Sequence, residues 1–238
     1  MNIGSILSRS FEKFPEIPIK NNIRVFLSFN RIVPKFVSDL SPLKGYELYY
    51  HLKEGDIVVD AGAFTGDYTI FAAKKVGKSG KIIAFEPDEK NRKILKKNLV
   101  HAKLDNVIII PKGLWDKNTT LDFKASSGLH STALTGQSDT KIEVVRLDDE
   151  LKKIGITKID VLKMDIEGAE IEAIQGSINT LKNNEVNVMI ASYHIVNGVT
   201  TSGFLENYLK NLGYSVRSDF EKHLTTYASK DQLLLTNA

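Results

Sequence analysis

The chain has 238 residues, of which 42% are hydrophobic and 26% are charged, and its formal net charge is +3. That length supports one large domain with a buried core, and the apolar content excludes a disordered chain. The chain contains no cysteine, which excludes disulfides, cysteine-ligated zinc, iron–sulfur clusters and a cysteine nucleophile. A net charge this small gives no reason to expect nucleic acid as a partner.

The N-terminal segment 1–45 differs in composition from the rest of the chain. It combines basic residues with the apolar stretch IRVFLSFNRIVPKFV, in which Pro34 interrupts any single long helix. We expect a short helical cap that covers a cleft or a partner subunit, and a homodimer through this extension stays open. A membrane-surface helix is the weaker alternative, because charged and apolar residues do not separate onto two faces.

Nothing in the sequence predicts a membrane span or an export signal. No apolar run approaches the roughly 20 residues needed to cross a bilayer. Polar and charged residues interrupt the start of the chain, MNIGSILSRSFEKF, before a signal-peptide core can form. We therefore expect a cytoplasmic protein.

Strands and helices alternate along residues 46–238, which we expect to form the main domain. Apolar segments predict strands of a central sheet at residues 56–63, 81–87, 106–113, 159–165 and 186–194. Capping residues and apolar spacing predict helices at residues 66–77, 88–99, 171–181 and 204–213. Further strands are predicted as an antiparallel excursion at 120–125 and 141–147, and as two closing strands at 214–220 and 232–238, joined by a polar turn.

This alternation is typical of a mostly parallel sheet with helices on both faces and right-handed crossovers. We therefore predict an α/β fold of the Rossmann-like type. Ligands of such sheets bind beyond the carboxyl ends of the strands, so the residues at those ends are the candidate site residues.

The first strand ends in the loop Asp60-Ala61-Gly62-Ala63-Phe64-Thr65-Gly66. Its glycines allow a sharp turn and a close approach to a ligand, and the following helix N-terminus offers amide donors. The second strand ends at Glu86, whose carboxylate can accept hydrogen bonds from both hydroxyls of a ribose. These features predict a nucleoside site, with a plain strand–helix turn and a capping Asp as the alternative.

The loop argues against a phosphate ligand. It lacks the Lys and Ser/Thr of a P-loop, and its glycine spacing differs from the dinucleotide fingerprint. Asp60 would repel a phosphate, whereas it can receive an ammonium group directly or through water. A nucleoside that carries an amino acid and no phosphate points to S-adenosylmethionine.

The fourth and fifth strands end in residues that suit proton transfer. Lys163 and Asp165 lie two apart and share one face of the strand, so we expect Asp165 to pair with this buried Lys. His194 ends the neighbouring strand and is expected beside Asp165. The alternative is that His194 is a hydrogen-bonded surface residue without a catalytic role, and that Glu167 and Glu170 only stabilise the N-terminus of the following helix. The remaining histidines are expected to be structural or solvated: His51, His101, His130 and His223.

The segments DAGAFTGDYT, AFEPD and IDVLKMDIEGAE, followed by a strand that ends in Tyr-His, resemble FkbM-type methyltransferases over about residues 46–216. The resemblance implies the seven-stranded sheet of class I S-adenosylmethionine-dependent methyltransferases. It implies cofactor contacts as follows: the methionine part by Asp60, Gly62, Ala63 and Gly66, the ribose by Glu86, and the adenine near Gly113, Leu114 and Trp115. Two positions depart from many relatives, which carry Asn at Phe64 and Glu at Ser192.

Methyl transfer to a hydroxyl requires the acceptor to lose its proton, a task that suits a neutral histidine near its usual pKa. We therefore expect His194 to be the general base and Asp165 to orient it or the substrate. A divalent metal held by Asp165 ranks second, because the sequence shows no further acid next to His194, and no metal site is predicted.

The acceptor itself is predicted mainly by exclusion. The chain has no adjacent prolines of the kind found in enzymes that methylate amide or base nitrogens, and no cysteine for a covalent route to pyrimidine carbon. A hydroxyl on a sugar, glycolipid or secondary metabolite is left, as the resemblance also implies, with the loop 126–140 and the cap facing it. A nicotinamide-dependent oxidoreductase and a non-catalytic binding module on this scaffold stay open as alternatives.

Overall fold

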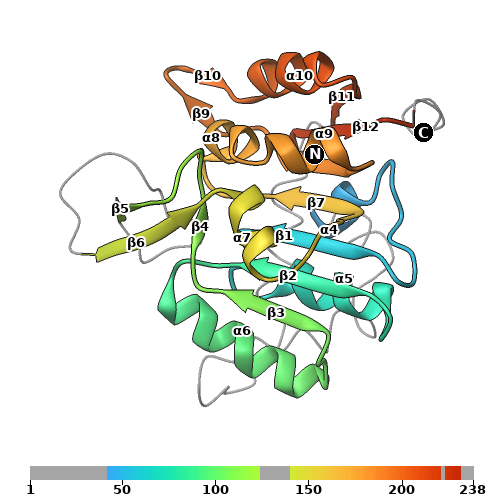
Figure 1. Ribbon diagram of the computed structural model, residues 1–238, viewed down its shortest axis with the longest axis vertical. Helices are drawn as coiled ribbons and strands as arrows, with labels where there is room; N and C mark the ends of the chain where they lie inside the picture. The colour runs from blue at the N-terminus through green and yellow to red at the C-terminus, as the bar shows by residue number, and fades with distance from the viewer. Residues whose placement is uncertain (1–41, 124–139, 221–222, 232–238) are drawn as a thin grey trace, which may run out of the picture. The chain divides into compact units, whose positions relative to one another are not determined.

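The computed structural model describes residues 42–123, 140–220 and 223–231 (Figure 1). The predicted cap lies outside these residues except for its last four, as do most of the loop 126–140 and the predicted closing strand 232–238. Helix α4 (Pro42–Tyr46) spans the predicted boundary between cap and main domain. Among the described residues, no helix is long and apolar enough to cross a membrane.

A seven-stranded sheet in the order β11-β12-β8-β7-β1-β2-β3 lies at the centre of the fold. Its strands are β1 (Ile57–Ala61), β2 (Lys81–Phe85), β3 (Val107–Ile110), β7 (Val161–Met164), β8 (Asn187–Ala191), β11 (Ser215–Asp219) and β12 (Thr225–Ser229). β3, β2, β1, β7 and β8 pair in parallel, and β12 runs antiparallel to both of its neighbours. The predicted α/β class and its seven-stranded, mostly parallel sheet are confirmed.

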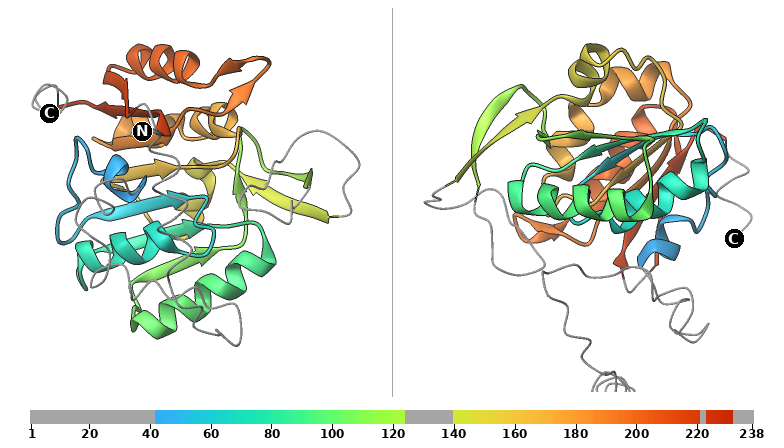
Figure 2. Two further views of the ribbon diagram at one scale, coloured as in Figure 1. Left: turned by 180° about the vertical axis from the view of Figure 1, so that it is seen from behind. Right: turned by 90° about the horizontal axis from the view of Figure 1, so that it is seen from below.

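Helices cover both faces of this sheet (Figures 1 and 2). The longer ones are α5 (Asp67–Val76), α6 (Glu89–Ala102) and α10 (Ser202–Asn211), and the shorter ones are α7 (Leu147–Lys153), α8 (Glu170–Gln175) and α9 (Ile178–Asn183). Each face of the sheet has its own hydrophobic core, and neighbouring residues of β1 belong to different ones. Val58 packs in the core with α4 and α5, and Val59 packs in the core with α7 to α10. Alternation of this kind follows from the two-residue period of a strand, which requires apolar residues on both faces of a covered sheet.

A smaller sheet in the order β4-β6-β5 stands beside the main one. It consists of β4 (Gly113–Leu114), β5 (Thr119–Phe123) and β6 (Thr140–Val145). β5 and β6 are antiparallel, which confirms the predicted excursion. A hairpin of β9 (Ile195–Val196) and β10 (Val199–Thr200) follows β8 directly.

Two predicted elements differ from the structure. The helix predicted over 171–181 is broken into α8 and α9 at Gly176, where a Cβ would lie 2.0 Å from the carbonyl oxygen of Trp115. The last strand is β12, inside the segment predicted as a polar turn. The strand was not predicted because its polar threonines resemble a turn in the sequence. Thr225 and Thr226 are nevertheless completely buried, and their hydroxyls donate to His223 O and Ser192 Oγ.

Candidate functional site

A cavity of about 430 Å³ opens where β1, β2 and β7 end. Six of the residues predicted for the site line it: Gly62, Glu86, Gly113, Leu114, Trp115 and Asp165. The other four, Asp60, Ala63, Gly66 and His194, are buried and do not line it, although His194 Nε2 lies 3.8 Å from Oδ1 of the lining residue Asp165. The tertiary structure therefore brings the ends of strands that are far apart in the sequence to one cavity, as expected for an open α/β sheet.

The loop after β1 depends on Gly62. This residue has φ +79°, and a Cβ there would lie 1.9 Å from the carbonyl oxygen of Asp165. Its amide and that of Ala63 both donate to Phe85 O at 3.0 Å. Gly66, with φ +99°, starts α5 and packs against Leu95. Gly62 therefore lets the loop lie directly on the end of β7, and Gly66 lets it approach Leu95 of α6, which a side chain at either position would prevent.

Asp60 stabilises this loop through buried hydrogen bonds. It is completely buried, and its oxygens accept from Lys163 Nζ at 2.9 Å and from Thr69 Oγ1 at 2.6 Å. Lys163 also donates to Gly62 O at 3.2 Å. The ion pair of Lys163 is thus with Asp60 and not, as predicted, with Asp165. Because Asp60 has no exposed surface, any contact with a ligand ammonium group has to pass through the loop that it supports.

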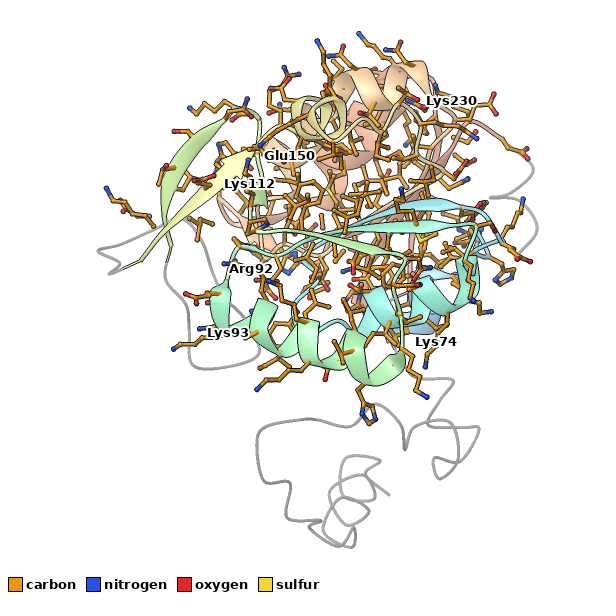
Figure 3. All side chains as sticks on the ribbon, turned by 60° about the horizontal axis from the view of Figure 1, so that its bottom comes forward. Lys74, Arg92, Lys93, Lys112, Glu150 and Lys230 are labelled. Carbon is orange, nitrogen blue, oxygen red and sulfur yellow. The ribbon has the colours of Figure 1, made fainter. Side chains whose placement is uncertain are left out.

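Glu86 joins the loop to helix α6. Its Oε2 accepts from the amide of Phe64 at 2.8 Å and its Oε1 from the amide of Asp88 at 2.9 Å. Burial raises the pKa of Glu86, and these hydrogen bonds offset the rise only in part. Arg92, labelled in Figure 3, donates from Nη1 to Glu86 O at 3.0 Å and to Pro87 O. The carboxylate is therefore held rigidly at the cavity wall, and each oxygen keeps acceptor capacity for a further donor.

His194 lies in a group of three acids, two of which, Asp165 and Glu167, line the cavity. Its Nδ1 is 2.9 Å from Glu170 Oε1, and its Nε2 is 3.5 Å from Glu167 Oε2 and 3.8 Å from Asp165 Oδ1. β7 and β8 are neighbouring parallel strands. β8 ends at Ala191 and not at His194 as predicted, and the segment that follows the strand brings the ring beside Asp165. The expectation that no further acid stands next to His194 is wrong, because the turn after Asp165 folds both glutamates back onto the ring.

The charges of this group alter the expected chemistry of His194. Burial lowers the pKa of the imidazole, but the carboxylates of Glu167, Glu170 and Asp165 raise it more, to about 10. Burial raises the pKa of Asp165, but His223, Lys163 and His194 lower it more, to about 2. The surrounding carboxylates therefore favour the protonated imidazole when no cation is bound, which differs from the expected neutral histidine near its usual pKa.

Comparison with known proteins shows the family of this chain. The pattern of the Methyltransferase FkbM domain matches residues 60–216, which is more than half of the chain. The chain belongs to the FkbM methyltransferase domain family.

Several relatives of this FkbM domain are known. Methyltransferase sdnD of Sordaria araneosa is 27% identical over 161 residues, 53% of this chain and 62% of that protein. Hexuronic acid methyltransferase AglP of Haloferax volcanii is 27% identical over 146 residues, 60% of this chain and 57% of that protein. The chain thus spans about three fifths of the length of these curated relatives.

A solved structure shows the same fold. The methyltransferase FkbM of Methylobacillus flagellatus KT superposes on the chain with a TM-score of 0.58 at 18% sequence identity. The superposition covers 79% of this chain and 48% of that one.

Two residues that line the cavity were missed by sequence reasoning, and one of them, His223, lies beyond the residues 60–216 that match the FkbM domain. His223 was expected to be structural or solvated, yet it lines the cavity and its Nε2 lies 3.7 Å from Asp165 Oδ2. Tyr193 also lines the cavity, and its ring centroid lies 4.1 Å from that of His194 and 4.6 Å from that of His223. Tyr193 could have been found as the residue before His194, whereas His223 could not, because β12 was not predicted.

The two departures from the FkbM pattern have different surroundings. Phe64 has φ +49°, in the left-handed region that Asn tolerates better than Phe, and it lines the cavity. Ser192 is completely buried, and its hydroxyl donates to Leu224 O and accepts from Thr226 Oγ1. The first departure therefore changes the cavity wall, and the second belongs to the pairing of β8 with β12.

Proposed function

We propose that this chain is an S-adenosylmethionine-dependent methyltransferase that acts on an oxygen of a sugar, a glycolipid or a secondary metabolite. One observation carries the proposal: Gly62, Glu86 and Trp115 line the same cavity as Asp165. Such a cavity can hold a nucleoside at one end and present its reactive group to an acceptor at the other. Membership of the FkbM family supports the reaction class.

The proposed cofactor position follows the cavity wall. The methionine part lies along the loop at Gly62 and Ala63, which leads into the N-terminus of α5. The ribose hydroxyls donate to Glu86, whose oxygens are already fixed by the amides of Phe64 and Asp88. The adenine lies against the apolar wall formed by Leu114 and Trp115. Asp60 and Gly66 shape the loop without lining the cavity.

The acceptor oxygen is supported by chemistry and by a relative. AglP is named for a hexuronic acid, and a hexuronic acid offers only oxygen nucleophiles, in hydroxyl and carboxyl groups. In the proposed reaction the bond between methyl carbon and sulfonium sulfur breaks with its electron pair left on sulfur, the oxygen–methyl bond forms, and the proton of the acceptor hydroxyl passes to water. Catalysis rests mainly on alignment of donor and acceptor, and Asp165 and His194 are the residues that we propose to position the acceptor.

We expect the Glu86→Ala variant to bind S-adenosylhomocysteine roughly 10- to 100-fold more weakly than the wild-type chain, because charge-assisted hydrogen bonds to the ribose are lost. Isothermal titration calorimetry on the full chain measures this change. Glu89→Ala, which removes an exposed carboxylate three residues away, should leave the affinity unchanged. Glu86→Gln, which keeps the side-chain volume, guards against a loss that comes from misfolding.

The same titration separates the rival functions. Binding of NADH without binding of S-adenosylhomocysteine would overturn the methyltransferase proposal in favour of an oxidoreductase. Saturable nucleoside binding without turnover of any hydroxyl acceptor would favour the non-catalytic module. Equal affinities of the wild type and the Glu86→Ala variant would contradict the proposed ribose contact.

Trp115 offers an optical test of the adenine position. It is the only tryptophan of the chain, and it lines the cavity with 9% of its surface exposed. We expect S-adenosylhomocysteine to change its fluorescence saturably, with the midpoint found by calorimetry, because a base stacked nearby alters the surroundings of the indole. Calorimetric binding without any fluorescence change would place the adenine elsewhere.

A further inference from the structure

One nitrogen and two carboxylate groups converge on a single point beside the cavity. His194 Nε2 lies 3.5 Å from Glu167 Oε2 and 3.8 Å from Asp165 Oδ1. One ligand atom from each of the three residues lies within 4.8 Å of the other two. Protein ligands bind divalent cations at about 2.0–2.3 Å, so atoms spaced in this way need only small shifts to share one ion.

Two of these atoms lack hydrogen bonds within the part of the chain that the structure describes. Asp165 Oδ1 and His194 Nε2 are buried from solvent, and neither makes a hydrogen bond to any described group. They face one another at 3.8 Å, which is too long for a hydrogen bond. The His194 side chain is only 9% exposed. A buried polar atom without a hydrogen-bond partner lowers the stability of the fold. Two such atoms that face one another therefore indicate that a ligand binds between them.

Glu170 places a carboxylate against the other nitrogen of the imidazole. The glutamate is completely buried, and its Oε1 lies 2.9 Å from His194 Nδ1. The same oxygen accepts from the amides of Ile166 at 3.1 Å and Gly168 at 3.2 Å. Metal-binding histidines are commonly oriented by a carboxylate at the second ring nitrogen, which directs the free nitrogen toward the ion.

We propose that Asp165, Glu167 and His194 bind a divalent cation, with Glu170 as the positioning residue for His194. Three carboxylates around one imidazole favour a positive charge at this point. A ligand set of one nitrogen and two carboxylates suits a first-row ion such as Mn²⁺ or Zn²⁺, whereas Mg²⁺ and Ca²⁺ prefer oxygen alone.

The catalytic role of this cation rests on the proposed function. Three protein ligands leave coordination positions open, and Asp165 and Glu167 both line the cavity. An acceptor hydroxyl bound at an open position would have its pKa lowered, and its proton would pass to water in the cavity. The oxygen would then take the methyl group, and the carbon–sulfur electron pair would stay on sulfur.

The experiment measures Mn²⁺ binding alone, by electron paramagnetic resonance of the free ion, on the full chain after treatment with EDTA and desalting. The expected result is one saturable Mn²⁺ per chain, which Zn²⁺ displaces. Glu167→Gln and Asp165→Asn should each lose this binding, and Glu170→Gln should weaken it roughly 10- to 100-fold because the imidazole loses its orienting carboxylate. Glu172 lies on α8 with Glu170 but outside the proposed cation site. Glu172→Gln is therefore the matched control and should bind Mn²⁺ as the wild type does.

Two results would overturn the cation site: no Mn²⁺ binding by the wild-type chain, or equal binding by the wild type and the Glu167→Gln variant. Glu167 is 22% exposed, so its substitution to Gln is the change least liable to prevent folding. Binding of S-adenosylhomocysteine is measured separately on the same samples. A missing cation site with intact nucleoside binding would leave the proposed methyltransferase function standing.

Discussion

The Gly62→Ala variant is expected to lose about 2–5 kcal/mol of folding free energy, from overpacking and from a positive φ, and to lose S-adenosylhomocysteine binding. The added Cβ would lie 1.9 Å from Asp165 O, so the loop after β1 and the end of β7 have to move apart. This movement separates the proposed cofactor loop from the residues that position the acceptor. Urea unfolding and calorimetric titration measure the two losses.

Gly155→Ala is the matched control for this variant. Gly155 also has a positive φ, +73°, but a Cβ there meets no atom within 4 Å. Its substitution should therefore cost only the backbone strain, about 1–2 kcal/mol, and should leave nucleoside binding intact. Equal losses of stability in the two variants would show that the contact of Gly62 with Asp165 O is not tight.

The Lys163→Met variant should be destabilised by about 3–5 kcal/mol, because it leaves the carboxylate of Asp60 buried without its charge partner. Lys163 is 4% exposed and Asp60 is fully buried, so water cannot replace the lost ammonium group. The double variant Asp60→Asn/Lys163→Met should recover much of the loss, since no buried charge is then left unpaired. Urea unfolding of both single variants and the double variant gives the coupling free energy.

A surface ion pair serves as the comparison. Lys158 Nζ lies 2.8 Å from Asp160 Oδ1, but the Lys158 side chain is 66% exposed. Lys158→Met should change the stability by about 0–1 kcal/mol, because solvent screens such pairs. If Lys163→Met lowers the free energy of unfolding no more than Lys158→Met does, the buried pair of Lys163 and Asp60 does not stabilise the loop as we infer.

Local sequence patterns determined the scaffold and the cofactor side of the site. Short apolar runs that end in small or acidic residues predicted β1, β2, β3, β7 and β8, because a sheet covered on both faces requires apolar residues at consecutive positions. Gly62 and Glu86 follow β1 and β2 directly. Parallel strands bring their carboxyl ends to one edge, so a residue at a strand end can be placed without knowledge of the rest of the chain.

Contacts between strands could not be inferred in the same way. Lys163 and Asp165 share a face, but residues two apart on a strand are separated by about 6.6 Å, whereas partners on adjacent strands lie about 4.8 Å apart. The register of β1 and β7 places Asp60 directly opposite Lys163. Lys163 therefore pairs with Asp60, the closer carboxylate, and the register that brings them together is a property of the folded sheet.

The acceptor side of the site was decided by tertiary structure. Glu167 and Gly168 have positive φ values, +58° and +101°, which turn the chain after β7 and bring two glutamates onto His194. His223 reaches Asp165 because β12 inserts between β8 and β11, although its threonines resemble a turn in the sequence. The sequence alone therefore determined which strand ends form the site, because each is a local pattern. Only the folded chain decided which charges meet there, because the protonation of His194 depends on groups that local patterns do not bring together.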